Sequence, residues 1–179
     1  MKLLRLCACL ALLAMLCAIA AVSLAADTFG VYTLVPSICP SSEGDGSADL
    51  YFGPTQGYLH EDGLTLDLTG PYVFFGQVDC WAMVAAGTPE RFGPVGWVEA
   101  AAANFPEAPL LSFDDALPVM VEEDTFLTAD PLSDSPASLC DVARGTQVLL
   151  LAHLGDWGYV QAEADGTPVR AFLPLSAIL

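Results

Sequence analysis

The chain has 179 residues and carries 22 acidic side chains against 5 basic ones, for a formal net charge of −17, while 54% of its residues are hydrophobic. So many apolar residues exclude most classes of disordered protein. Lys2 and Arg5 lie at the amino terminus, so the rest of the chain keeps three arginines, no lysine and a formal charge of −19. Nucleic acids and anionic membrane surfaces are therefore excluded as favoured partners, because this charge would repel them.

The amino terminus has the pattern of a signal peptide. Lys2 and Arg5 precede an uncharged, apolar stretch over 6–26 that ends in small residues, which suits removal by signal peptidase. We place the signal peptide at residues 1–25 and expect a secreted or cell-surface protein. The alternative is an uncleaved membrane anchor, because an uncharged stretch of this length can span a bilayer.

Three of the six cysteines lie beyond this segment, namely Cys39, Cys80 and Cys140. An odd number permits at most one internal disulfide. The pairing to test first is Cys39–Cys80, and the alternative is a set of free buried thiols. Neither His60 nor His153 lies at ligand spacing from two cysteines, so we expect no zinc site, and no other metal or cofactor is indicated.

Short apolar runs bounded by glycine, proline, aspartate and serine predict an all-β protein with short strands. Two stretches share one order of signals: Gly70, Trp81, Gly87-Thr88-Pro89 and Trp97 in the first, and Gly145, Trp157, Gly166-Thr167-Pro168 and Phe172 in the second. The interval from the first glycine to the last aromatic residue is 27 residues in both. We interpret the stretches as two diverged copies of one small β domain, with Gly-Thr-Pro in a hairpin loop.

The pattern sets the expected domain boundaries. The first domain covers 27–104 and contains an exposed, acid-rich insertion over 41–49. A linker over 105–120 follows, and its apolar residues suggest that it packs against a domain. Just before it, the alanines of 100–103 can form one short helical turn. The second domain covers 121–179.

The second copy contains a longer ordered series of elements. It includes Thr128-Ala129-Asp130-Pro131-Leu132, Arg144-Gly145-Thr146-Gln147-Val148, Gly155-Asp156-Trp157-Gly158-Tyr159-Val160 and Gly166-Thr167-Pro168-Val169-Arg170-Ala171-Phe172-Leu173-Pro174. This order resembles the bacterial SH3-like domain over nearly all of 121–179, and the first copy matches over 70–98. The resemblance implies two tandem, five-stranded SH3-like barrels on an exported cell-envelope protein.

Aromatic side chains are the candidate ligand-binding residues. Alternation along one strand puts Trp157 and Tyr159 on one face and Val160 on the other. If Val160 points into the barrel, the two rings face outward and form a shallow platform for a peptide or a sugar. Trp81 and Tyr58 would form the equivalent site in the first copy. The alternative is that the opening loop or the neighbouring domain covers the rings.

These features together predict a non-enzymatic, exported binding or accessory protein that engages envelope peptides, peptidoglycan or an envelope protein. A protein-assembly module without wall binding is the second hypothesis. A cysteine hydrolase that uses Cys80 is the third. Such a nucleophile needs a helix start and a positioned histidine, whereas the repeat places Cys80 at a strand start.

Overall fold

The computed structural model describes residues 30–39, 46–102 and 109–178, and in these ranges the chain is all-β apart from two short 3-10 helices. The predicted signal peptide over 1–25 lies outside the described residues. Within them, no helix has the length and apolar character that crossing a membrane requires.

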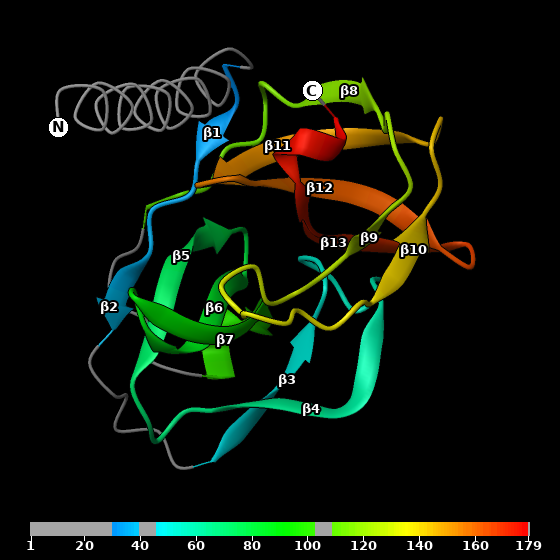
Figure 1. Cartoon of the computed structure of the whole chain (residues 1–179). Coiled ribbons are helices and arrows are strands. Elements are labelled where there is room, and N and C mark those ends of the chain that lie inside the picture. Colours follow the sequence, from blue (N-terminus) through cyan, green and yellow to red (C-terminus); the bar gives the residue numbers. More distant parts are fainter. Residues whose placement is uncertain (1–29, 40–45, 103–108, 179) are drawn as a thin grey trace, which may run out of the picture.

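The first half of the fold is a sheet of six strands in the order β2-β5-β6-β7-β3-β4. Strands β5, β6 and β7 form an antiparallel meander, drawn in green in Figure 1. The elements are β2 (Ser37–Cys39), β3 (Ser47–Tyr51), β4 (His60–Asp67), β5 (Tyr72–Val78), β6 (Trp81–Thr88), β7 (Arg91–Glu99) and the 3-10 helix η1 (Ala100–Ala102). The predicted helical turn is therefore confirmed.

The second half repeats this arrangement. Strands β11, β12 and β13 form its meander, β8 pairs with β11, and β9 pairs with β10. An isolated bridge between Thr128 and Phe172 joins the end of β9 to β13, just as Tyr51 pairs with Trp97 in the first half. The elements are β8 (Leu117–Met120), β9 (Thr125–Leu127), β10 (Cys140–Val142), β11 (Gln147–Leu154), β12 (Trp157–Ala164), β13 (Thr167–Pro174) and the 3-10 helix η2 (Leu175–Ala177).

The two halves share details of register as well as strand order. The pairing of the first two meander strands shifts between Phe74 and Gly76 in the first half, and between Leu150 and Ala152 in the second. A β-bulge kinks the sheet locally, and it lies at the same place in both halves. The two halves therefore share strand order and bulge position over six strands each.

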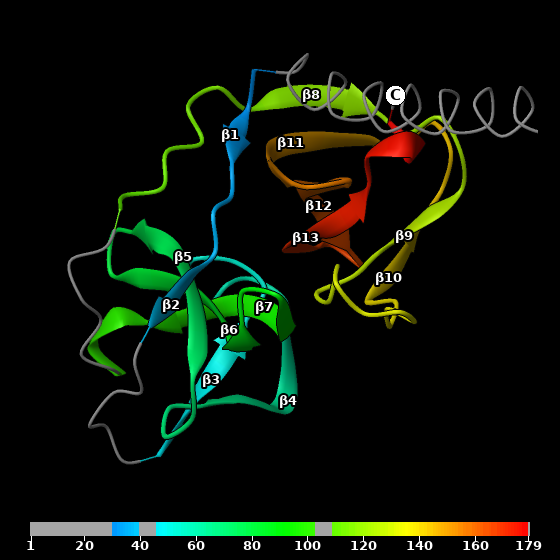
Figure 2. The same ribbon diagram turned by 60° about the vertical axis from the view of Figure 1, so that its left-hand side comes forward.

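Each half also sends a leading segment across to the other half, as Figure 2 shows. The first leader, residues 31–34, contains β1 (Tyr32–Thr33), which pairs in parallel with β11. Its Leu34 amide donates a hydrogen bond to the His153 carbonyl at 2.9 Å. The second leader, residues 109–111, makes the reciprocal contact with β5, where the Leu111 amide donates to the Gln77 carbonyl at 2.8 Å.

The predicted linker over 105–120 therefore does not merely connect two domains. Residues 105–108 lie outside the described ranges, 109–111 form the second leader, and Leu117–Met120 form the edge strand β8. Because both leaders cross, the halves are intertwined, and the chain forms one body.

The hydrophobic core has three layers. One cluster lies within the first half, around Phe74, Val84 and Val98, and another within the second half, around Leu150, Val160 and Leu173. The third lies between the two meanders and includes Phe75, Met83, Trp97, Tyr159 and Phe172. Each meander thus buries both faces, which explains why its strands have nearly continuous apolar sequences.

Two expectations about the fold need correction. The described residues form three sheets, of six, five and two strands, and none of them closes on itself through strand pairing. The predicted closed barrels are therefore replaced by open sheets that share a core. The expected insertion over 41–49 is also partly a strand. Residues 41–45 lie outside the described ranges, but Ser47–Tyr51 form β3, because Ala48 and Leu50 alternate into the core of the first half.

Candidate functional site

The predicted aromatic platform is not on the surface. Val160 points into the core of the second half and Tyr159 lies on the opposite face, as alternation predicts. That face packs against the first half, however, so Tyr159 is only 2% exposed and Trp81 only 7%. The expectation that these two rings face solvent is wrong, because both rings belong to the hydrophobic cluster between the halves. Trp157 is half-buried and packs against the same cluster between the halves.

Tyr58 is also engaged with the other half. Its hydroxyl donates a 3.0 Å hydrogen bond to Gln161 Oε1, and Arg170 Nε donates to the same oxygen at 2.9 Å. The Arg170 guanidinium lies 5.4 Å from the ring centroids of both Tyr58 and Phe113, which is cation–π distance. These contacts fill the surface where a ligand would meet Tyr58.

Two equivalent loops cross between the halves. The first loop, residues 52–59, joins β3 to β4, and the second loop, residues 129–139, joins β9 to β10. The Arg170 amide donates to the Phe52 carbonyl at 2.7 Å, and the Val95 amide donates to the Ala129 carbonyl at 2.8 Å. Both loops therefore begin against the third meander strand of the opposite half.

After this shared start the two loops differ. The first loop returns to β13, where the Leu59 amide donates to the Pro168 carbonyl at 2.9 Å. The second loop is three residues longer, and within the described ranges no corresponding backbone hydrogen bond joins it to Phe92 or Gly93. The interface between the two halves therefore has two equivalent ends. The first loop closes one of them by pairing with β13, and the other end is open.

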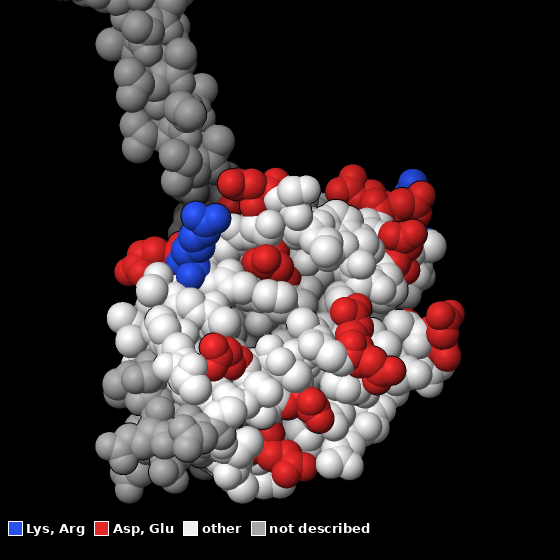
Figure 3. All heavy atoms as spheres, turned by 90° about the horizontal axis from the view of Figure 1, so that it is seen from below, with Lys and Arg blue, Asp and Glu red and all other residues white. Residues whose placement is uncertain are grey.

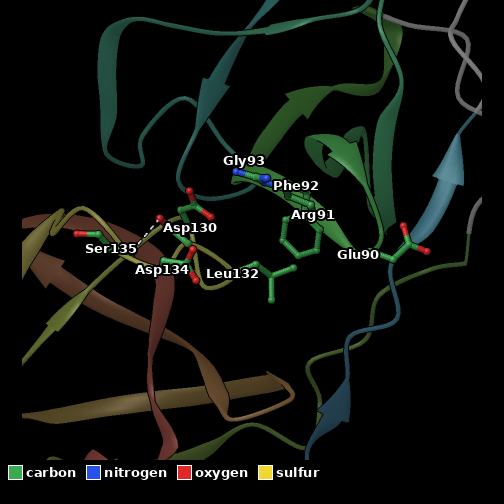
Figure 4. A pocket seen from close by; sticks show the side chains of 9 residues that line it. Glu90, Arg91, Phe92, Gly93, Asp130, Leu132, Asp134 and Ser135 are labelled. Carbon is green, nitrogen blue, oxygen red and sulfur yellow. Dashed lines mark hydrogen bonds between the residues drawn. The ribbon is translucent and has the colours of Figure 1, made fainter.

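The open end is a cleft of about 700 Å3 between the second loop and the β6–β7 hairpin. Figure 4 shows the loop residues on one side and the hairpin residues on the other, with Leu132 reaching toward the hairpin. The lining residues are Glu90, Arg91, Phe92, Gly93, Asp130, Leu132, Ser133, Asp134 and Ser135. Such a volume lies within the usual range of ligand sites.

The strand β7 is irregular beside the cleft. Ala85 pairs with Val95 and Gly87 pairs with Phe92, so β7 contains one extra residue between these pairs. The extra residue falls at Gly93-Pro94, whereas β13 pairs with β12 without a shift of register. The two ends of the interface between the halves therefore differ in the strand that borders them.

The cleft holds an unusual carboxylate. The Oδ1 oxygen of Asp130 is buried and has no hydrogen-bond partner in the structure. Desolvation by burial raises the pKa of Asp130 above its ordinary value, although hydrogen bonds with the backbone amides of Leu132 and Ser133 partly offset this. Glu90 and Asp134 add two exposed carboxylates, and the Leu132 side chain is 43% exposed.

The other surface carboxylates are dispersed. On the face drawn in Figure 3, Asp and Glu side chains are spread between neutral residues, with few Lys or Arg side chains among them. The described residues contain no group of three or more His, Cys, Asp and Glu side chains that could hold a metal ion.

Cys80 lies in the two-residue turn between β5 and β6, the place that Asp156 occupies between β11 and β12. Its thiol is free and exposed, which does not match the expected pairing of Cys80 with Cys39, and Cys140 is free and half-buried. The His60 ring stacks on Tyr51 and its Nδ1 hydrogen-bonds the Leu50 carbonyl at 3.0 Å.

The second histidine is also occupied. His153 Nε2 and Thr33 Oγ1 share a 2.9 Å hydrogen bond where β1 crosses to β11. In the described contacts, each histidine ring thus has a partner other than Cys80. This arrangement gives no support to a cysteine–histidine pair.

No protein-family model, curated protein or solved structure matches this chain. The cleft is therefore identified as a candidate site from its geometry alone. Sequence reasoning did not find it, although two signals point to it in retrospect: the longer second loop and Pro94 within a strand.

Proposed function

We propose that this chain is a non-enzymatic, exported binding or accessory protein built from two SH3-like halves, and that its binding site is the cleft between the second loop and the β6–β7 hairpin. The order of elements supports the SH3-like assignment. Each half has two strands joined by a loop, then a three-stranded meander and a 3-10 helix. This is the order that the resemblance of the second copy implies.

The observation that carries the proposal is the difference between the two ends of the interface between the halves. Both ends are built from the same elements, but the chain fills one end with Tyr58 and Arg170 and leaves the other open. The open end is a concave site between two segments of the chain, and such places are candidate ligand sites. The lining combines the exposed side chain of Leu132 with polar and charged side chains, which can contact a polar chain such as a peptide.

The net charge restricts the partner. With a formal charge of −19 beyond Arg5, the protein repels phosphate-rich polymers, so we expect it to bind envelope peptides, peptidoglycan or an envelope protein through local contacts. Binding of this kind tolerates salt, because screening weakens long-range charge effects more than close contacts.

The experiment is retention of residues 26–179 on purified wall sacculi and on an envelope-protein extract. The cleft variant is Leu132→Glu, which adds charge at an exposed position. Its control is Val35→Glu, since Val35 is 62% exposed and does not line the cleft. We expect the wild type and Val35→Glu to be retained on one of the two materials and Leu132→Glu to be lost. Equal retention of all three proteins, or retention of none, contradicts the proposal.

A protein-assembly module is the second candidate, and one observation favours it. Val35 and Ile38 are 62% and 64% exposed, and Ile38 lies on β2, an edge strand of the first sheet. Exposed apolar residues at a sheet edge are typical of a surface that pairs with another chain. Light scattering tests this candidate: a dimer that Ile38→Lys converts to a monomer supports it, and a wild-type monomer that retains no partner on cross-linking opposes it.

A further inference from the structure

Arg170 is a half-buried cation without a carboxylate partner. Of the arginines that the structure describes, Arg91 and Arg144 are exposed, whereas Arg170 is half-buried against the rings of Tyr58 and Phe113. Within the described ranges Arg170 forms no ion pair, although the chain carries 22 acidic side chains. Because a cation that is partly removed from water is normally paired, the missing counter-charge can come from a ligand.

The guanidinium of Arg170 is fixed at one end and open at the other. Its Nε donates to Gln161 Oε1 at 2.9 Å, which holds the planar group in place. No described residue accepts a hydrogen bond from its two terminal nitrogens, and both nitrogens have solvent-accessible surface. A guanidinium presents such donors in one plane, which matches the two oxygens of a carboxylate.

The same hydrogen bonds orient the amide of Gln161. Its Oε1 accepts from the Tyr58 hydroxyl as well as from Arg170 Nε, and two donors identify this atom as the oxygen. The Nε2 group therefore points away from both donors, and no described residue accepts a hydrogen bond from it. Nε2 thus adds a second free donor group beside the guanidinium.

A groove of about 540 Å3 lies beside these donors, and Gln161 lines it together with Leu149, Glu163 and Pro168. Paired residues of an antiparallel sheet point to one face, so the pairs Gln161–Arg170 and Glu163–Pro168 place the Arg170 side chain on the face that forms the groove. Arg170 therefore borders the groove. No residue lines both this groove and the cleft of the proposed function.

We propose that this groove binds a peptide through one carboxylate group, which the terminal nitrogens of Arg170 and the Nε2 group of Gln161 hold. Leu149 and Pro168 offer apolar contacts to the side chain next to the carboxylate. A single negative charge is favoured over a phosphate, because Glu163 lines the same groove and the protein is strongly acidic. This second site goes beyond the proposed function.

The test is an NMR titration of 15N-labelled residues 26–179 with three synthetic peptides. The first is acetyl-Gly-Leu-Ala with a free carboxylate, the second is its carboxyl-terminal amide, and the third is acetyl-Gly-Leu-Glu-amide, whose carboxylate is on a side chain. The protein variants are Arg170→Lys, which keeps the charge but removes the planar group, and Arg144→Lys as its control. Arg144 is exposed and does not line the groove.

We expect a carboxylate peptide to shift the amide signals of 146–149 and 161–163 and the Nε–H signal of Arg170. The amide peptide and the Arg170→Lys variant should each show binding weaker by about tenfold, and Arg144→Lys should bind as the wild type does. Of the two carboxylate peptides, the one that binds more tightly identifies whether a chain end or a side chain is recognised.

Three results overturn the inference: no shifts with any peptide, binding of the amide peptide that equals that of both carboxylate peptides, or unchanged binding by Arg170→Lys. The comparison of the peptides uses only the wild type, so it remains decisive if Arg170→Lys fails to fold. The loss of retention expected for Leu132→Glu tests the cleft separately, because Leu132 does not line the groove.

Discussion

The indole Nε1 of Trp97 donates a 2.8 Å hydrogen bond to the hydroxyl of Tyr159, and this bond joins the two halves inside their shared core. Trp97 is fully buried, and Tyr159 is 2% exposed. Burial raises the pKa of Tyr159 well above its ordinary value, although the charge of Arg170 and the bond from Trp97 act in the other direction. The hydroxyl therefore stays protonated, and it satisfies the indole donor where no water reaches.

Replacement of the tyrosine isolates this bond. Tyr159→Phe leaves the Trp97 N–H buried without an acceptor, so we expect it to lower the free energy of unfolding by about 1–3 kcal/mol. In a Trp97→Phe background the same change should be nearly neutral, because the donor is already gone. Urea denaturation of the four proteins measures the difference. Equal losses in the two backgrounds would show that the bond does not couple the halves.

The second leader depends on a glycine. A Cβ atom at Gly76 would lie 2.6 Å from Leu111 Cγ and 2.8 Å from the Pro109 carbonyl oxygen, and its φ of +151° favours glycine. Gly76→Ala should displace the leader and cost about 1–3 kcal/mol beyond the backbone strain. Gly63→Ala is the control, since Gly63 also has positive φ but nothing lies within 4 Å. A similar loss of stability in both variants, measured by urea denaturation, would mean that the contact with the leader contributes nothing.

The two described thiols should differ in reactivity. Cys80 is exposed in a turn, whereas Cys140 is half-buried, and desolvation together with the charges of Asp141 and Asp165 raises the pKa of the Cys140 thiol. Because the thiolate is the reactive form, iodoacetamide at pH 8 should modify Cys80 faster than Cys140 in the folded protein. Peptide mass spectrometry over time measures both rates. Faster modification of Cys140 would contradict the placement of the two side chains.

The carboxyl of Asp130 should make stability depend on pH. Its pKa is raised in the folded state, so the folded protein binds this proton more tightly than the unfolded chain does. Its contribution to stability is then present below the unfolded pKa of about 3.9 and is lost as pH rises through the folded pKa. We expect Asp130→Asn to be at least as stable as the wild type at pH 7, with a smaller advantage at pH 3. Melting curves across this range check the sign, and a variant that is less stable at pH 7 contradicts it.

Much of the fold could be predicted because turn residues and apolar runs are local signals. Trp81 and Trp157 begin equivalent strands, and the repeat places Cys80 and Asp156 at equivalent turns. The Gly-Thr-Pro signal was less exact. Gly87 and Thr88 end β6 before the turn, whereas Thr167 and Pro168 begin β13 after it, so the shared tripeptide marks the same hairpin but opposite sides of it.

The candidate site could not be predicted because it depends on contacts between the halves. Alternation correctly separates Tyr159 from Val160, but nothing local distinguishes a face covered by solvent from one covered by the other half. The crossing of the leaders is equally non-local, since the partner of Leu34 is His153. The cleft follows from both facts, because the second loop opens only relative to a hairpin of the opposite half.

The most direct test of this account is whether the two halves need each other to fold. Residues 26–104 and 105–179 should be produced separately and then mixed, with amide signal dispersion in NMR as the readout. Each fragment lacks one leader strand and one wall of the shared core, so we predict narrow dispersion for either fragment alone and native-like dispersion for the mixture. A dispersed spectrum from one fragment by itself would contradict the single intertwined body, and with it the cleft that lies between the halves.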